Sequence, residues 1–244
     1  MRIFIIIYFG LLFQNCISQE YNQENNIITF DYNHQFPTGN LSQEYGNNSS
    51  LGLNFIKIKN KISYGIDIYY MFGNNVKNDS LLNNISTDNG WLINSSGELD
   101  TILLYQRGWN SHFLFGRSIK KIKNSNGKIY FFIGLGYLQH KIRLESNRTD
   151  LPQIDENYII GYDKLRNGIS TKIGLDYIYM KKNNAFKYKI GIELINSFTK
   201  SKRSYDFPSM QQIDNSLRID KLIGLKFGII IPINRNNDNK FHYY

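Results

Sequence analysis

The sequence predicts an all-β fold, an eight-stranded antiparallel up-and-down β-barrel that spans a membrane, with short turns at one end and long loops at the other. Three observations predict it. Apolar and polar residues alternate over many segments, as they do in strands with one apolar face. The connections between these segments alternate between short and long. The first residues have the pattern of an export signal.

The N-terminal residues predict export from the cytoplasm. Arg2 precedes an unbroken apolar run over residues 3–13. A membrane-spanning helix needs about 20 apolar residues, so this run fits the central part of a secretory signal instead. The small residues Cys16 and Ser18, at the −3 and −1 positions, suit cleavage before Gln19, and we expect a signal peptide over residues 1–18. A lipoprotein acylated at Cys16 is the alternative.

Eight strands are expected in order along the rest of the chain. Their ranges are about 26–35, 50–59, 61–72, 99–119, 128–145, 167–180, 186–198 and 218–233. The alternation is clearest in the third strand, where one face carries Ile62, Tyr64, Ile66, Ile68, Tyr70 and Phe72. In the last strand, Ile219, Ile223, Leu225, Phe227, Ile229 and Ile231 share a face in the same way.

The connections give the barrel its two ends. Short polar turns are expected at Asn60, residues 119–127 and residues 181–185. Long polar loops are expected at residues 36–49, 73–98, 146–166 and 199–217. An even number of strands places both termini on the short-turn side, which is the periplasmic side of such barrels. We therefore expect the barrel over residues 19–235 and a polar periplasmic tail over residues 236–244.

Alternation alone does not distinguish a membrane barrel from a soluble one. A soluble sandwich or barrel turns its apolar face inward, whereas a membrane barrel turns it toward lipid. The signal peptide, the unequal loops and the aromatic residues near strand ends favour the membrane. These aromatics are Tyr69, Tyr70, Phe72, Trp109, Tyr137, Tyr177, Tyr179 and Tyr188. A secreted soluble β-barrel binding protein remains the alternative fold.

The expected inward faces carry both signs of charge. An eight-stranded barrel has a lumen that side chains can fill, and an unpaired charge there would cost several kcal/mol. We therefore expect a network of ion pairs in place of an aqueous channel, and no porin activity. Its residues are Asp67, Lys172, Asp176, Lys189, Glu193, Asp220 and Lys226.

Composition and motifs exclude several function classes. The net charge of +9 would suggest nucleic acid, but the basic residues are dispersed and the chain is exported, so no nucleic-acid partner is expected. One cysteine and four scattered histidines leave no cluster for a metal, and no cofactor is expected. Ser111 and His112 are adjacent in a strand, so their side chains point to opposite faces. We expect no enzyme; a lipid-modifying barrel, with a Ser and a His converging on the lipid-facing wall, is the alternative.

Two features suggest surfaces for partners. The expected strands 99–119 and 128–145 exceed the roughly 9–11 residues that cross a bilayer, so their ends should project as an outer rim beside the long loops. Lysines flank the short turns and could meet anionic lipid headgroups, although lysine enrichment of solvated turns explains them equally well. These are Lys57, Lys59, Lys61, Lys120, Lys121, Lys123, Lys128, Lys181, Lys182 and Lys187.

Several segments make the chain resemble small outer-membrane β-barrel proteins of the Bacteroidetes. These are Tyr105-Gln106-Arg107-Gly108, residues 134–142, residues 161–165, residues 198–203 and Pro37-Thr38-Gly39-Asn40-Leu41. The resemblance implies a location in the outer membrane of a Gram-negative bacterium and a structural or interaction role. By analogy with small barrels of that phylum, an accessory subunit of a type IX-like secretion or barrel-assembly machine is an alternative.

Polar and aromatic residues of the expected outer rim are the candidates for binding a partner protein or outer-membrane lipid. They are Arg107, Gln139, His140, Lys141, Tyr162, Asp163, Lys200, Lys202 and Arg203. The alternative is that they only hold the long loops over the barrel mouth.

Overall fold

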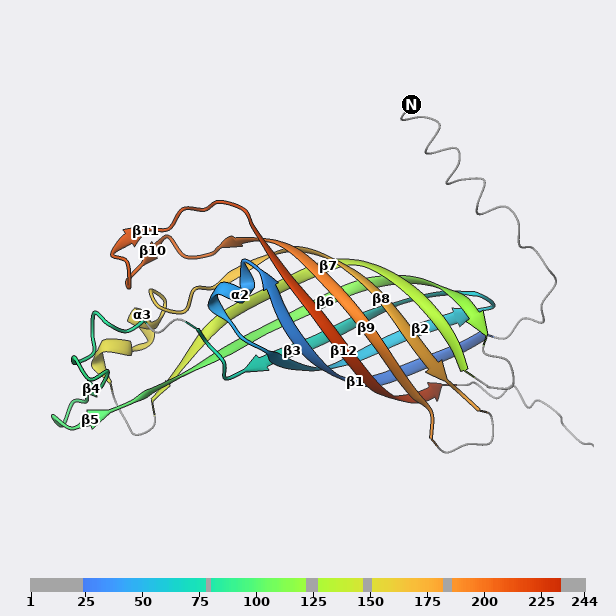
Figure 1. Ribbon diagram of the computed structural model, residues 1–244, viewed down its shortest axis with the longest axis horizontal. Helices are drawn as coiled ribbons and strands as arrows, with labels where there is room; N and C mark the ends of the chain where they lie inside the picture. Colours follow the sequence, from blue (N-terminus) through green and yellow to red (C-terminus); the bar gives the residue numbers. More distant parts are fainter. Residues whose placement is uncertain (1–23, 78–79, 122–126, 147–150, 182–185, 234–244) are drawn as a thin grey trace, which may run out of the picture.

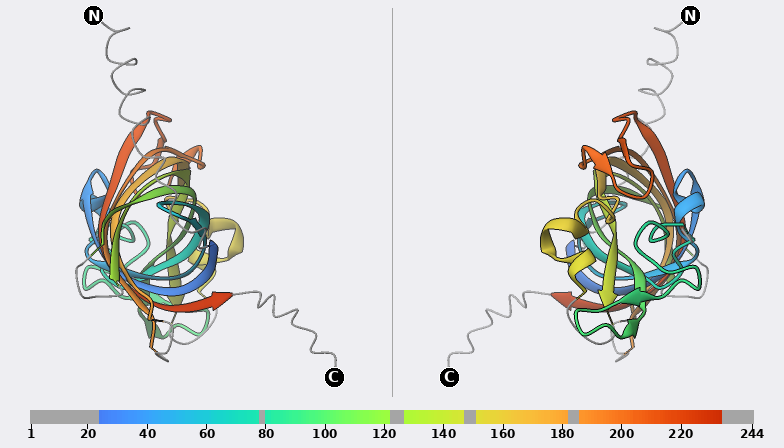
Figure 2. Two further views of the ribbon diagram at one scale, coloured as in Figure 1. Left: turned by 90° about the vertical axis from the view of Figure 1, so that its right-hand side faces the viewer. Right: turned by 90° about the vertical axis from the view of Figure 1, so that its left-hand side faces the viewer.

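The computed structural model describes residues 24–77, 80–121, 127–146, 151–181 and 186–233, in which eight antiparallel strands close into a barrel (Figure 1). Each strand pairs with its neighbours along the chain, and the first pairs with the last, so the topology is up-and-down. Figure 2 shows the ring from both ends. The strands are β1 (Glu24–Gly39), β2 (Asn48–Lys59), β3 (Ile62–Gly73), β6 (Ile102–Lys121), β7 (Gly127–Ser146), β8 (Arg166–Tyr179), β9 (Tyr188–Ser201) and β12 (Arg218–Ile233).

The first long loop is shorter than predicted. β1 continues through Pro37 to Gly39, and only the short helix α2 (Leu41–Glu44) and its flanks separate it from β2. Pro37 is tolerated because the β1–β2 ladder ends at Gln35, so Pro37 pairs only with Leu222 of β12.

The other short elements belong to the long loops, at the end away from residues 24 and 233 (Figure 1). They are β4 (Leu92–Ile93), β5 (Leu99–Asp100), the 3-10 helix η1 (Pro152–Ile154), α3 (Glu156–Ile159), β10 (Tyr205–Asp206) and β11 (Gln211–Gln212). Extending the fourth strand back to residue 99 was wrong, because β5 pairs with β4 and not with the barrel. No helix in the described ranges is long and apolar enough to cross a membrane.

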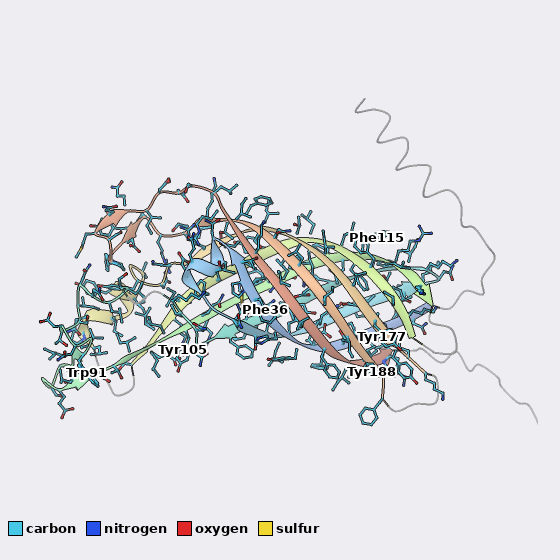
Figure 3. All side chains as sticks on the ribbon, in the orientation of Figure 1. Phe36, Trp91, Tyr105, Phe115, Tyr177 and Tyr188 are labelled. Atoms are coloured by element: carbon cyan, nitrogen blue, oxygen red, sulfur yellow. The ribbon has the colours of Figure 1, made fainter. Side chains whose placement is uncertain are left out.

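The outward face of the barrel is apolar. Its side chains are large and exposed, and Phe113 leaves 73% of its surface uncovered. Aromatic pairs border this belt at both ends, Trp109 with Tyr137 toward the long loops and Tyr179 with Tyr188 toward the short turns. Figure 3 shows Tyr188 at the short-turn end of the barrel. A closed ring of eight antiparallel strands with an apolar outward face and buried charged residues inside is the arrangement of a transmembrane β-barrel, which confirms the predicted fold class.

The lumen is filled in three layers. Along β12, Ile230 belongs to an apolar cluster near the short turns, Lys226 to a charged middle layer, and Leu222 to an apolar cluster near the long loops. The short-turn cluster contains Ile27, Ile56, Ile58, Leu114, Tyr130, Phe132, Ile178 and Ile230. The long-loop cluster contains Leu41, Tyr45, Met71, Leu81, Leu138, Ile142, Leu144, Tyr162, Ile195 and Leu222.

Tyr69 is a correction to the predicted aromatic borders. It belongs to the inward face of β3 and is buried in the lumen, where its hydroxyl donates a hydrogen bond to Asp31. Its neighbour Tyr70 faces outward and is exposed. The reason is the strand pleat, which sends adjacent side chains to opposite faces.

Candidate functional site

The charged middle layer of the lumen is a chain of alternating acids and bases, which we call the lumen ion chain. Neighbouring side chains in it lie within salt-bridge distance of each other, and all of them are buried. In order, it runs Asp67, Lys172, Glu193, Lys226, Asp176, Lys189 and Asp31. Buried charges need such compensation, because each has lost its hydration.

Distances are shortest at the two ends of the lumen ion chain. Lys189 Nζ lies 2.6 Å from Asp31 Oδ2, and Lys172 Nζ lies 2.8 Å from Asp67 Oδ2. In the middle, Lys226 Nζ lies 3.0 Å from Asp176 Oδ1. Each of the three lysines therefore contacts carboxylates that belong to other strands. The lumen ion chain in this way crosses the barrel interior.

Inward glycines make room for these side chains. A Cβ built on Gly228 would lie 2.0 Å from Asp31 Oδ1, and one built on Gly191 would lie 2.0 Å from Asp176 Oδ1. Any larger residue at these two positions would push the carboxylates away from their lysines. The charged layer therefore needs glycine at these two positions in order to pack.

Asp67, His112 and Ser170 form a hydrogen-bonded series in the lumen. His112 Nδ1 lies 3.2 Å from Asp67 Oδ1, and His112 Nε2 lies 2.8 Å from Ser170 Oγ. Gly136 lies between His112 and Ser170 in the strand register, and its missing side chain lets them meet. The order of groups is that of a serine-hydrolase triad.

The surroundings of this series argue for a structural role. All three side chains are buried, and Asp67 is also held by Lys172. Ser170 lies within β8, which pairs with β7 on one side and β9 on the other. The backbone hydrogen-bonding groups around it therefore serve the sheet. A substrate carbonyl has no route to Ser170 Oγ between the two apolar clusters, and an oxyanion site needs backbone N–H groups that are free.

Asp220 is separate from the lumen ion chain. It lies nearer the long loops, where it accepts a hydrogen bond from Thr199 and lies 3.0 Å from His140 Nε2. His140 was placed on the outer rim by the sequence, but it is fully buried and faces inward. The alternation of β7 explains this, because His140 has the same parity as the inward Leu138 and Ile142.

Three other rim candidates hold the loops together. Arg203 donates two hydrogen bonds to the Asp163 carboxylate, from Nε at 2.9 Å and from Nη2 at 2.6 Å. This contact raises the pKa of Arg203. Tyr162 is buried beside them, with its ring 5.4 Å from that of Phe207. These residues join the loop after β7 to the loop after β9.

The remaining rim candidates lie on the outside of the barrel. Lys141, Lys200 and Lys202 are exposed. Arg107 is opposite Lys141 in the strand register and stacks over the Tyr105 ring, 4.6 Å from its centroid. Gln139 and Lys200 flank Asn167 of β8 in the register, and Gln139 accepts a hydrogen bond from it. The nine candidates therefore form no common site; they divide into buried, loop-joining and outward groups.

Sequence reasoning missed Asp31 as a member of the charged layer, and it missed the contact between His112 and Ser170. Asp31 stands on the inward face of β1 with Thr29 and Asn33, a polar series that alternates with Phe30 and Tyr32 and could have been read from the sequence. The contact between His112 and Ser170 left no such signal, since it depends on the register of β6, β7 and β8. Within the described residues, no three His, Cys, Asp or Glu side chains cluster as a metal site requires. The predicted signal peptide and polar tail lie outside those residues.

The sealed lumen leads to a prediction for conductance. Apolar clusters close both ends of the charged layer, so ions have no hydrated path through the barrel. Purified protein in planar bilayers is expected to give no stable open conductance. A large, steady open state in single-channel recordings would show that the lumen differs from this packing.

Comparisons with known proteins give similar structures but no sequence family. No protein-family model matches the sequence, and no curated protein matches it. Neisserial surface protein A is similar with a TM-score of 0.47 and 12% identity, over 84% of this chain and 96% of that one. The outer membrane protein OprG from Pseudomonas aeruginosa has a TM-score of 0.43 and 12% identity, over 85% and 95% of the two chains. Ail, the attachment invasion locus protein of Yersinia pestis, in complex with the heparin analogue sucrose octasulfate, has a TM-score of 0.36 and 10% identity, over 86% and 99%.

Proposed function

We propose that the protein is a non-enzymatic outer-membrane β-barrel of a Gram-negative bacterium that acts as a structural or interaction component through its outer rim. The apolar belt supports membrane insertion, and the lumen, filled by a charged layer between two apolar clusters, supports a role without transport. Export through a signal peptide over residues 1–18 is part of this proposal.

The observation that carries the proposal is the apolar surface of the outer rim, beyond the membrane belt. In the β4–β5 hairpin, Ile93 and Leu99 pair across the strands and are 47% and 54% exposed. Figure 3 shows Trp91 at the tip of the same region. The other exposed apolar residues of the rim are Leu103, Tyr158, Ile160, Tyr205, Met210 and Leu217. Apolar groups exposed to water in this number indicate an interaction surface.

The outer rim is held in shape by contacts between its loops. Asn84 donates hydrogen bonds to the backbone oxygens of Phe207 and Pro208, and Gln153 donates one to the backbone oxygen of Ile93. Phe207 also packs against the long-loop apolar cluster. Because these contacts already fix the loops, a partner that binds the rim would not have to order them.

Outer-membrane lipid is the first expected partner, and a partner protein of the secretion or barrel-assembly class is the alternative, by analogy with small barrels of the Bacteroidetes. The exposed Lys141, Lys200 and Lys202 lie where the barrel wall meets the loops and suit anionic groups of either partner. The buried Asp163 and Tyr162 contribute to the rim by joining its loops.

The test is crosslinked affinity capture from mildly solubilised envelopes. We expect a rim variant with Trp91→Ser, Ile93→Ser and Leu99→Ser to lose the proteins that the wild type captures, because the apolar contact area is removed. The variant should keep the heat-modifiable gel mobility of a folded barrel, since none of the three side chains lies in the barrel wall.

The control is Lys181→Ser at the opposite end of the barrel, which should capture the same proteins as the wild type. Recovery of the barrel alone from wild type and variant, or identical capture by both, would contradict the proposed interaction role.

A further inference from the structure

We propose that the outward face of β2, β3 and β6 at the short-turn end binds the headgroup of an anionic phospholipid. The inference rests on the membrane insertion proposed above and names a lipid site at the end away from the outer rim. The outward residues at every second position of a strand form a column, and the site lies where the apolar part of two such columns ends.

Near the short turns, two outward columns pass from apolar residues to a basic one, and on β6 the exposed Ile119 follows that cation. On β2 the outward residues Leu53 and Phe55 are followed by Lys57. On β6 the outward residues Phe113 and Phe115 are followed by Arg117. Two residues along a strand are about 7 Å, so each cation lies just below side chains that face hydrocarbon. This is the depth of the lipid headgroups.

The strand register brings these cations to either side of β3. Lys57 is opposite Tyr64 in the β2–β3 ladder, and Arg117 is opposite Ile62 in the β3–β6 ladder. β2 and β6 are two strand spacings apart, about 10 Å, and Lys57 and Arg117 are offset by two residues along β3, about 7 Å, so their long side chains can reach one phosphate between them. Tyr64 is exposed between them, and a tyrosine at this depth has its hydroxyl among the headgroups.

Further basic residues surround this face. Lys59 follows Lys57 on the outward side of β2, Lys61 lies in the turn to β3, and the exposed Lys120 follows Arg117. One acidic residue of the neighbouring strand β1, Glu24, is the register partner of Lys59. The electrostatic potential at this face is therefore positive. Each Lys or Arg near an anionic membrane surface strengthens binding to that membrane by about fivefold.

The neighbouring belt favours a lipid over a protein as the occupant. Phe113 is the most exposed of the outward phenylalanines in the barrel wall, and it lies above Arg117 on the same strand. A phospholipid would place its acyl chain along this column and its phosphate at the cations below. A soluble anionic protein has no access to the apolar part of this face when the barrel is inserted.

The experiment uses tryptophan quenching by brominated lipids in vesicles. The chain has two tryptophans, Trp91 beside the β4–β5 hairpin and Trp109 on β6 in the aromatic border toward the long loops, and they are replaced by Trp91→Phe and Trp109→Phe. Tyr64→Trp then reports on lipid at the proposed site. Vesicles of phosphatidylcholine contain either brominated phosphatidylglycerol or brominated phosphatidylcholine, and the ratio of quenching gives the relative affinity for the anionic headgroup.

We expect phosphatidylglycerol to be preferred by at least about fivefold, with a preference that falls as salt is added. Lys57→Gln with Arg117→Gln should abolish the preference, whereas Arg143→Gln with Lys221→Gln, two exposed cations toward the other end, should not change it. Arg117→Lys keeps the charge and should keep the preference. Equal quenching by both lipids, or a preference that survives the first pair of substitutions, would overturn the proposal.

Heat-modifiable mobility in the same vesicles distinguishes this failure from failure of the proposed function. A folded, inserted barrel without lipid preference overturns the headgroup site alone. A protein that inserts into neither kind of vesicle overturns both the membrane placement and the site.

Discussion

Lys189→Met is expected to lower the free energy of unfolding by about 3–5 kcal/mol, because it leaves buried carboxylates without their cation. Lys189 is fully buried, and its Nζ contacts Asp31 Oδ2 at 2.6 Å and Thr29 Oγ1 at 3.1 Å. Asp176 Oδ2 is 4.0 Å away, so a second acid would lose compensation. Urea titration of the protein refolded into vesicles measures the effect.

Two further variants make this result specific. Adding Asp31→Asn to Lys189→Met should restore part of the lost stability, since the uncompensated charge is then removed. Lys200→Met changes an exposed lysine on the same strand and should cost little. If Lys189→Met costs no more than Lys200→Met, the lumen ion chain does not stabilise the barrel in the way its geometry indicates.

Ile192→Arg is expected to cost about 2–4 kcal/mol of folding free energy in vesicles, because it places a charge against hydrocarbon. Ile192 is outward on β9 and 53% exposed, and its register partners are Leu175 and Leu225. It lies between Tyr188 and Phe198 of the same strand, so it belongs to the middle of the apolar belt.

The control is the same substitution at Ile219, which is outward on β12 and 42% exposed. Ile219 lies beyond the outward Lys221, toward the long loops, so its side chain is near the membrane surface. Ile219→Arg should therefore cost about 0–1 kcal/mol. Equal losses of folding free energy at the two positions would show that the belt does not face a bilayer. A protein that is folded and monomeric in buffer without detergent would show the same.

The outward and inward faces could be read from the sequence because alternation is a local property. The side chains of Asp67 and Ile68 point to opposite faces whatever their strands pair with. The same rule, carried to the end of β7, would have placed His140 in the lumen. Tyr69 follows it too, because its parity is that of the inward Asp67 and excludes a place in the outward aromatic border.

Loop structure was harder to anticipate. The β4–β5 hairpin and the contact between Asp163 and Arg203 join segments whose sequences are polar and without period. Turn signals show that such a segment is not a strand, but they do not show which other loop it meets. The apolar residues of these loops, such as Leu81 and Phe207, gave no indication that they pack over the barrel mouth.

What the sequence determined by itself is the number of strands, their order and which residues face inward, because these follow from the two-residue period and the lengths of the connections. What only the tertiary structure decided is which inward residues meet. Lys172 and Asp67 are 105 residues apart, and Ser170 reaches His112 only across Gly136. Closure of the ring and the stagger of its strands set those distances, and neither is encoded within any one strand.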